Sequence, residues 1–175
     1  TIYGERYPKE FTMFDGSNVK SHLPLNNEQR SMVADYLNAT LYNDYIVESI
    51  IHMFSDRNAI VIYFSDHGDE VYNFRMQQGR TDMKTDDPRA MRNQLDIPFL
   101  IYVSPRYAAS HQHTVEQIRK SVDRPFMTDN LPQVIFDLLG VSTAYYKPGR
   151  SVINDEYRPL KHRMLQVGRA YPGDF

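Results

Sequence analysis

Hydrophobic residues recur at helical spacing in the first third of the chain. They are Val33, Tyr36, Leu37, Leu41, Tyr45, Val47, Ile50, Ile51 and Phe54. Residues three or four apart share one face of a helix, so this spacing predicts a long amphipathic helix. Asn26, followed three residues later by Gln29, resembles a capping box and predicts where the helix begins. The polar residues 55–58 predict its end.

Two uninterrupted apolar runs of strand length follow, at residues 59–64 and 97–103. Continuous runs rich in β-branched residues are typical of strands that are buried on both faces of a parallel sheet flanked by helices. The polar stretch between them, up to Leu95, predicts a long loop, and long loops in compact domains are often functional.

The rest of the chain adds mainly helices. Amphipathic spacing predicts one helix over residues 114–121 and another over residues 129–139, with Gly140 at a helix-terminating position. Residues 1–25 are irregular, and a short strand is predicted near residues 151–154. The order helix, strand, loop, strand, helix, helix indicates an α/β fold.

Two strands alone cannot make a sheet with covered faces and edges. We therefore expect the neighbouring strands to come from a missing N-terminal part of the same protein. Uncovered strands recruit other chains, so we expect this fragment to self-associate, drawing in Tyr3, Tyr7, Phe11 and Phe14. Alternatively, residues 1–25 fold back and give a monomer. Light scattering across a dilution series distinguishes these outcomes.

Composition narrows the classes of function. The chain of 175 residues fits a single domain, residues 1–175. A net charge of −2 and a pI near 6.3 give no electrostatic footprint for nucleic acid. No apolar run approaches the roughly 20 residues of a membrane helix, so the chain itself is expected to be soluble. There is no cysteine, so His, Asp or Glu must hold any metal.

The candidate chemistry lies at Asp66, His67 and Gly68, directly after the first predicted strand. Ligands of open α/β sheets bind beyond the carboxyl ends of the strands. A carboxylate and an imidazole together suit Zn²⁺ or Mn²⁺. Neighbouring side chains of a strand point to opposite faces, so the chain must turn there, and Gly68 permits unusual dihedral angles. A simple turn, with Asp66 bound to backbone amides, stays open at this point.

Several stretches in chain order carry a family resemblance: residues 6–11, 42–45, 61–72, 79–80, 96–101 and 128–141. Together they resemble the bacterial phosphoethanolamine transferases of the alkaline phosphatase/sulfatase superfamily, which modify lipid A and lipopolysaccharide core. The resemblance implies the C-terminal portion of an alkaline-phosphatase-like domain, with a mainly parallel sheet flanked by helices.

The resemblance also implies a chemistry. Asp66 and His67 correspond to two ligands of a catalytic zinc, while the family's acidic ligand and threonine nucleophile lie upstream of Thr1. The intact enzyme would transfer phosphoethanolamine onto lipid A or lipopolysaccharide sugars through a phospho-enzyme intermediate. It would sit in the inner membrane with its catalytic domain facing the periplasm. The isolated chain is expected to bind zinc weakly and to turn over no ester.

One departure leaves the function open. Many relatives carry a further histidine in the loop where this chain has residues 74–79. Arg75 or Arg80 is a candidate to hold an anionic substrate group there, and each is also compatible with a solvated loop charge. The same metal site would serve a sulfatase or phosphodiesterase, and a non-catalytic sulfatase-like binding module is the third interpretation. The identity of the upstream nucleophile would separate the transferase from the hydrolases. The metal content of the full-length protein would separate the binding module from both.

Overall fold

The structure is a computed structural model that describes residues 3–80, 87–161, 163 and 171. The chain divides into two compact units. The first comprises Thr1–Met53, Ile62–Leu100 and Met164–Phe175, and the second comprises Phe54–Val61 and Ile101–Arg163. Within the described residues, no helix combines the length and the apolar character that crossing a bilayer requires.

The long helix α1, Asn27–Phe54, begins as the sequence predicts. The Asn26 amide donates to Gln29 Oε1, and the Gln29 amide donates to Asn26 Oδ1, both at 2.9 Å. These reciprocal bonds are those of a capping box, which satisfies amides that have no partner within the helix. The helix ends at Phe54, whose carbonyl accepts a bond from the Arg57 amide.

The N-terminal segment packs against α1 within the first unit. The ring of Phe11, in the 3₁₀ turn η1 (Lys9–Phe11), lies 4.8 Å from that of Tyr42 and 5.1 Å from that of Tyr45. The buried amide of Asn38 fixes the segment. It accepts from the amides of Met13 and Phe14 and donates to the Phe14 carbonyl, each at 2.9 Å.

The described part of the N-terminal segment thus folds back onto α1, and neither a monomer nor coverage of the strands follows from this contact. It does not cover the whole of α1, because Tyr45, Ile46, Ile50 and Met53 remain exposed. Self-association of the chain therefore stays a prediction.

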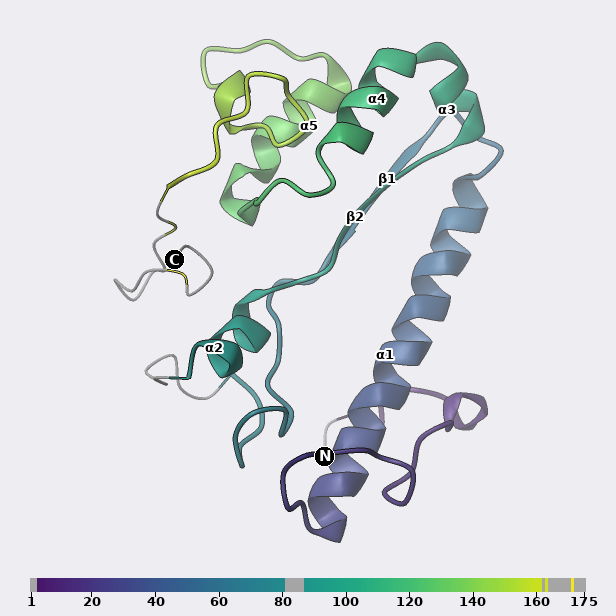
Figure 1. Ribbon diagram of the computed structural model, residues 1–175. Helices are drawn as coiled ribbons and strands as arrows, with labels where there is room; N and C mark the ends of the chain where they lie inside the picture. Colours follow the sequence, from purple (N-terminus) through teal and green to yellow (C-terminus); the bar gives the residue numbers. More distant parts are fainter. Residues whose placement is uncertain (1–2, 81–86, 162, 164–170, 172–175) are drawn as a thin grey trace. The chain divides into compact units, whose positions relative to one another are not determined.

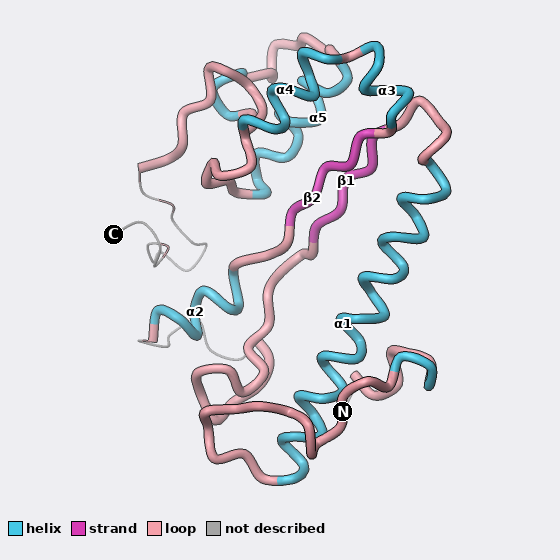
Figure 2. Tube along the Cα trace, turned by 45° about the vertical axis from the view of Figure 1, so that its right-hand side comes forward, coloured by secondary structure: helices cyan, strands magenta, loops and turns pink. Residues whose placement is uncertain are grey.

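Strands β1, Ile60–Phe64, and β2, Phe99–Val103, form a two-stranded sheet (Figure 1). They run antiparallel, as the tube in Figure 2 also shows: the Ser104 amide donates to the Ala59 carbonyl at 3.0 Å, and Phe64 faces Phe99 at the other end. The α/β class is confirmed. This pair does not have the expected parallel direction. An apolar run indicates how deeply a strand is buried and does not indicate the direction of the neighbouring strand.

Both strands are partly exposed. Phe64 and Leu100 are each more than one-third exposed. This exposure agrees with the expectation that two strands alone leave faces of the sheet uncovered.

Helix α2, Pro88–Leu95, interrupts the predicted long loop. Its N-cap Asp87 accepts a bond from the Arg89 amide, and Pro88 occupies the first helical position, where no amide is needed. The side-chain bond from Arg89 holds the pKa of Asp87 down at about 2. The helix is short and largely polar, and its buried residues are Ala90, Met91 and Gln94. The hydrophobic pattern was therefore too weak to reveal it.

The second unit contains the helices α3, α4 and α5. They span Pro105–Ser110, Gln112–Lys120 and Leu131–Leu139, with 3₁₀ turns at Thr128–Asn130 and Pro148–Arg150. Two of the helices match predicted ones within two residues. Gly140 ends α5 in the left-handed conformation, at φ 62°, as its position indicated.

The core of the second unit is built around Val134, Val152 and Ile153. The strand predicted near residues 151–154 is wrong, because these residues form consecutive turns. The Ser151 amide bonds to the Pro148 carbonyl, and the Asn154 amide bonds to the Ser151 carbonyl. Val152 and Ile153 are adjacent and both buried, which a strand with one solvent face does not allow.

Candidate metal site

Asp66 and His67 lie where the chain bends after β1. Asp66 Oδ1 accepts the His67 amide at 3.1 Å, and Asp66 Oδ2 lies 3.6 Å from His67 Nε2. The two side chains are 88% and 38% exposed, respectively. In a continued strand they would point to opposite faces, and the bend brings them side by side. A backbone amide thus occupies one oxygen of Asp66 and leaves the other available.

The imidazole of His67 is oriented by its own chain. His67 Nδ1 lies 2.7 Å from the Gly68 carbonyl oxygen, which can only accept a hydrogen bond. Nδ1 therefore carries the proton, and Nε2 presents its lone pair. A backbone carbonyl that fixes the tautomer in this way is the usual support of a histidine that binds metal.

This pair has a suitable geometry for one ion. Two donors that each lie about 2.1 Å from a tetrahedral zinc are roughly 3.4 Å apart, close to the 3.6 Å between Asp66 Oδ2 and His67 Nε2. Among the residues that the structure describes, no group of three or more His, Asp or Glu side chains could hold a metal. As a candidate metal site, the pair therefore offers two ligands and not a complete set.

Gly68 packs tightly against the end of α2. Its amide donates to the Gln94 carbonyl at 3.2 Å. A Cβ atom at this position would lie 2.1 Å from the Asn93 carbonyl oxygen and 2.7 Å from that of Asp96. Its φ is not positive, so the expectation that Gly68 provides unusual dihedral angles is wrong. Glycine is needed here because two stretches of backbone approach each other closely.

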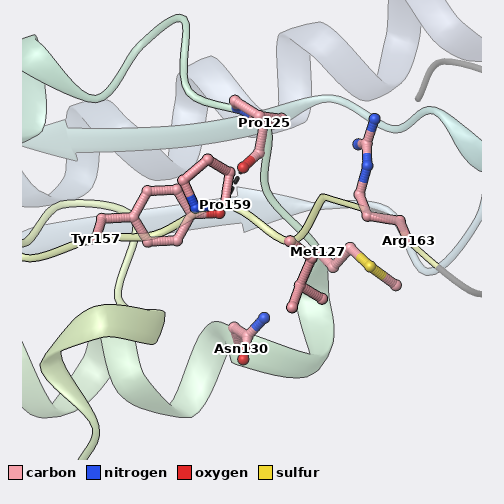
Figure 3. A pocket seen from close by; sticks show the side chains of 7 residues that line it. Pro125, Met127, Asn130, Tyr157, Pro159 and Arg163 are labelled. Carbon is pink, nitrogen blue, oxygen red and sulfur yellow. Dashed lines mark hydrogen bonds between the residues drawn. The ribbon is translucent and has the colours of Figure 1, made fainter. Parts of the chain in front are cut away.

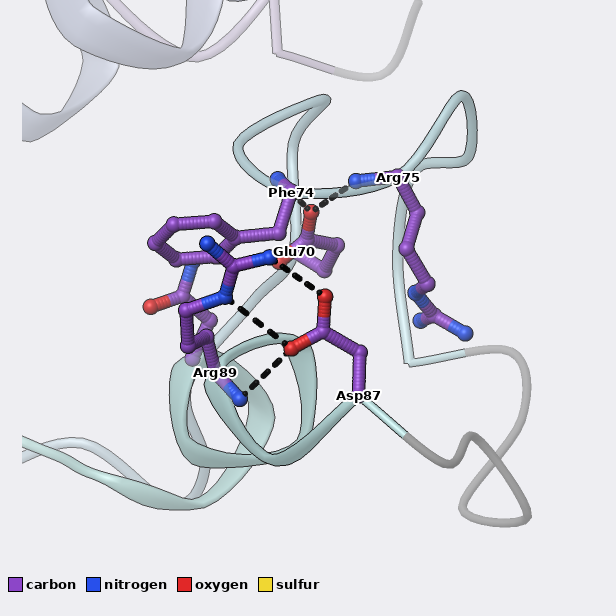
Figure 4. A network of polar contacts seen from close by, with 6 residues as sticks. Glu70, Phe74, Arg75, Asp87 and Arg89 are labelled. Atoms are coloured by element: carbon purple, nitrogen blue, oxygen red, sulfur yellow. Dashed lines mark hydrogen bonds and ion pairs between the residues drawn. The ribbon is translucent and has the colours of Figure 1, made fainter.

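Glu70 organises the loop that follows (Figure 4). Its side chain is fully buried. Oε1 accepts the amides of Phe74 and Arg75 at 2.6 and 3.1 Å, and Oε2 accepts Asn93 Nδ2 at 3.0 Å. Sequence reasoning missed this residue, because an acidic residue in a polar stretch normally faces water.

The two candidate anion-binding arginines differ in setting. Arg80 is exposed, whereas the Nε and Nη2 atoms of Arg75 are buried and have no hydrogen-bond partner. The side chain of Arg75 extends away from the carboxylate that binds its amide (Figure 4). Within the described residues, the structure records no polar contact between either arginine and Asp66 or His67, so both roles stay predictions.

Asp69 connects the site loop to the N-terminal segment. Asp69 Oδ2 accepts the hydroxyl of Tyr3, and Asp69 Oδ1 is buried without a hydrogen-bond partner. Burial and this bond raise the pKa of Tyr3 above its usual value, and burial beside Asp69 raises the pKa of Tyr36. Residues 66–70 are therefore held from both sides, by the N-terminal segment and by α2.

A pocket in the second unit is a different feature (Figure 3). It is lined by Pro125, Met127, Asn130, Tyr157, Pro159, Leu160 and Arg163. None of these is acidic or a histidine, so the lining offers a metal neither a carboxylate nor an imidazole.

Comparison with known proteins identifies the family of the chain. The sulfatase family model matches residues 2–141. The chain is 39% identical over 175 residues to phosphoethanolamine transferase EptC of Escherichia coli O18:K1:H7 (strain RS218 / NMEC), covering 97% of this chain and 28% of EptC. It is 36% identical to phosphoethanolamine transferase CptA of Salmonella typhimurium, with the same shares covered. The chain thus spans little more than a quarter of the length of these relatives.

Solved structures give the same result. A crystal structure of the C-terminal periplasmic domain of EcEptC from Escherichia coli, in complex with Zn, superposes with a TM-score of 0.79 at 37% identity. The match covers 90% of this chain and 43% of that domain. Since the family model matches well over half of the residues and these relatives exceed 30% identity, the chain belongs to the sulfatase family.

Proposed function

We propose that this chain is the C-terminal part of a zinc-dependent phosphoethanolamine transferase. In it, Asp66 and His67 supply two of the zinc ligands. The observation that carries the proposal is the placement of Asp66 Oδ2 and His67 Nε2 at 3.6 Å, with the other imidazole nitrogen bound to a backbone carbonyl. The zinc complex of the related domain supports the choice of ion, and Mn²⁺ is the alternative.

The residues of this chain have defined tasks in that reaction. Gly68, through its carbonyl, keeps the proton of His67 on Nδ1, and Asp66 uses one oxygen for a backbone amide and the other for the ion. A bound zinc supplies Lewis-acid chemistry, which activates a hydroxyl nucleophile and stabilises charge on the phosphoryl group. The nucleophile, a threonine in the resembling family, lies outside this chain. We propose that Arg75 or Arg80, in the loop that follows the pair, binds an anionic group of the substrate.

The substrate and location follow from the relatives. One relative, at 29% identity over 113 residues, is the Kdo(2)-lipid A phosphoethanolamine 7''-transferase of Salmonella typhimurium. We propose lipid A or lipopolysaccharide sugars as acceptors. The parent protein would lie in the inner membrane with this domain facing the periplasm, as the periplasmic location of the related EptC domain suggests.

A second candidate is a hydrolase that cleaves sulfate or phosphate esters. The match to the sulfatase family model favours it, because the same metal site supports both reactions. Supplying a lipid or glycan acceptor to the parent protein separates the two. A transferase moves phosphoethanolamine onto the acceptor, and a hydrolase releases it to water.

Zinc binding by the chain tests the proposal. We expect Zn²⁺ added to ¹⁵N-labelled chain to shift the side-chain signal of His67 with a weak affinity, because only two ligands are present. Asp66→Asn should weaken this response about tenfold or more, and His67→Gln should lower the zinc affinity measured by calorimetry by a similar factor, since one ligand cannot chelate. His113→Gln, at an exposed position in the first turn of α4, serves as the control.

The outcomes are distinct. A His67 response that is unchanged in Asp66→Asn, or a calorimetric zinc affinity that is unchanged in His67→Gln, would contradict the site. Tight zinc that survives dialysis against a mild chelator, or ester turnover by the isolated chain, would contradict the division of the site between this chain and the rest of the protein.

A further inference from the structure

Asn93 contacts the site segment twice. Its side chain donates to the carboxylate of Glu70 at 3.0 Å. Its carbonyl oxygen closes the space beside Gly68, where even a methyl group would lie 2.1 Å away. The next residue, Gln94, accepts the Gly68 amide. The last turn of α2 therefore holds residues 68–70 at both ends.

The carboxylate of Glu70 is buried, so its hydrogen bonds are needed to offset the cost of removing it from water. The side chain is 0% exposed, and among the described residues no basic side chain forms an ion pair with it. A buried carboxylate is costly unless several N–H groups bind it. Three do so here: the amides of Phe74 and Arg75 and the side chain of Asn93. Its position is thus fixed by three donors from two segments, and displacing it would leave a buried charge unbound.

We infer that Glu70 and Asn93 form a buried clamp that positions Asp66 and His67 for metal binding. The inference rests on the proposed function. The connection runs through Gly68: the clamp and the close approach of α2 fix the peptide of Gly68, and the carbonyl of that peptide orients the His67 imidazole at 2.7 Å. Glu70 is therefore a positioning residue. Mutating a residue that orients a metal ligand commonly lowers metal affinity roughly 10- to 100-fold.

Three variants test the clamp. Glu70→Ala removes the acceptor of all three donors. Glu70→Gln is the conservative variant, because its amide oxygen can serve the two backbone amides and its NH₂ group can face Asn93 once that side-chain amide turns over. Asp87→Ala is the matched control, since it removes the N-cap of the same helix and leaves its last turn, with Asn93, intact.

Two readouts are measured on each variant. The first, without metal, is hydrogen exchange at the amides of Phe74 and Arg75. The second is the Zn²⁺ titration of the His67 side-chain signal. We expect Glu70→Ala to speed hydrogen exchange at both amides and to weaken the zinc response about tenfold. Glu70→Gln should restore both readouts to within about threefold of the wild type, and Asp87→Ala should leave the zinc response within about twofold.

The outcomes separate the clamp from the metal site. If the amide hydrogens of Phe74 and Arg75 exchange freely in Glu70→Ala but the variant binds zinc like the wild type, the clamp alone is overturned. An equal loss in Asp87→Ala also overturns it, because the effect would then reflect the general stability of α2. If Glu70→Ala fails to fold, Asn93→Ala tests the same bond. A wild-type chain whose His67 signal ignores zinc overturns the proposed metal site and, with it, this inference, even where the two amides are protected.

Discussion

Gly68→Ala is expected to destabilise the first unit by about 3 kcal/mol or more and to abolish the response of His67 to zinc. The new Cβ would lie 2.1 Å from the Asn93 carbonyl oxygen and 2.7 Å from that of Asp96, and both atoms belong to the backbone. A flexible side chain could move aside, whereas backbone can move only by shifting the end of α2. Overpacking of this severity lies at the upper end of the known range of about 1–3 kcal/mol. Urea denaturation measures the loss.

Gly16→Ala is the matched control in the same unit. Its added Cβ would lie 3.5 Å from the Arg30 Cβ, an ordinary contact, and its φ is not positive. We expect the free energy of unfolding to change by less than about 1 kcal/mol. Equal stability of the two variants would show that the close approach of Gly68 to α2 is not real.

Asn38→Ala is expected to cost about 3 kcal/mol and to release the N-terminal segment from α1. The amide of Asn38 serves Met13, Phe14 and the hydroxyl of Tyr7 through four hydrogen bonds, and its side chain is 0% exposed. Each buried backbone group left without a partner costs about 1–3 kcal/mol. Limited proteolysis should cut residues 3–25 far faster in the variant, and urea denaturation gives the energy.

Asn43→Ala provides the comparison on the same helix. Asn43 is exposed, and the one bond recorded for its side chain runs to the Tyr63 hydroxyl at 2.7 Å. A change below about 0.5 kcal/mol is expected. A comparable loss in both variants would mean that burial of Asn38 does not anchor the segment.

The sequence predicted best the elements with strong local signals. The capping box of Asn26 and Gln29 and the left-handed Gly140 depend on residues close in the chain, so both ends were placed correctly. Helix α2 was missed because its inward face is short and includes the polar Gln94. The antiparallel pairing of β1 with β2 was not predicted, because strand pairing joins segments far apart in sequence, which local patterns do not encode.

The site was predicted in part. Asp66 and His67 stood out because a carboxylate and an imidazole follow a strand directly, and the resemblance reinforced them. Glu70 and Asn93 did not stand out, since their importance comes from burial and from a bond between residues 23 positions apart. The role of Gly68 was misassigned for the same reason: a close backbone approach is a tertiary property, whereas dihedral freedom is a local one.

The distance along the chain between Glu70 and Asn93 also sets an order of events during synthesis. Glu70 leaves the ribosome first, and the 23 residues up to its partner take roughly one to five seconds to add. During this interval the carboxylate stays hydrated, and the loop amides that it will bind compete with water. The candidate ligands Asp66 and His67 are thus synthesised well before Glu70 and Asn93 can hold them in place. A nascent chain that ends before Asn93 should contain Asp66, His67 and Gly68 but lack the Glu70–Asn93 contact that holds them in position.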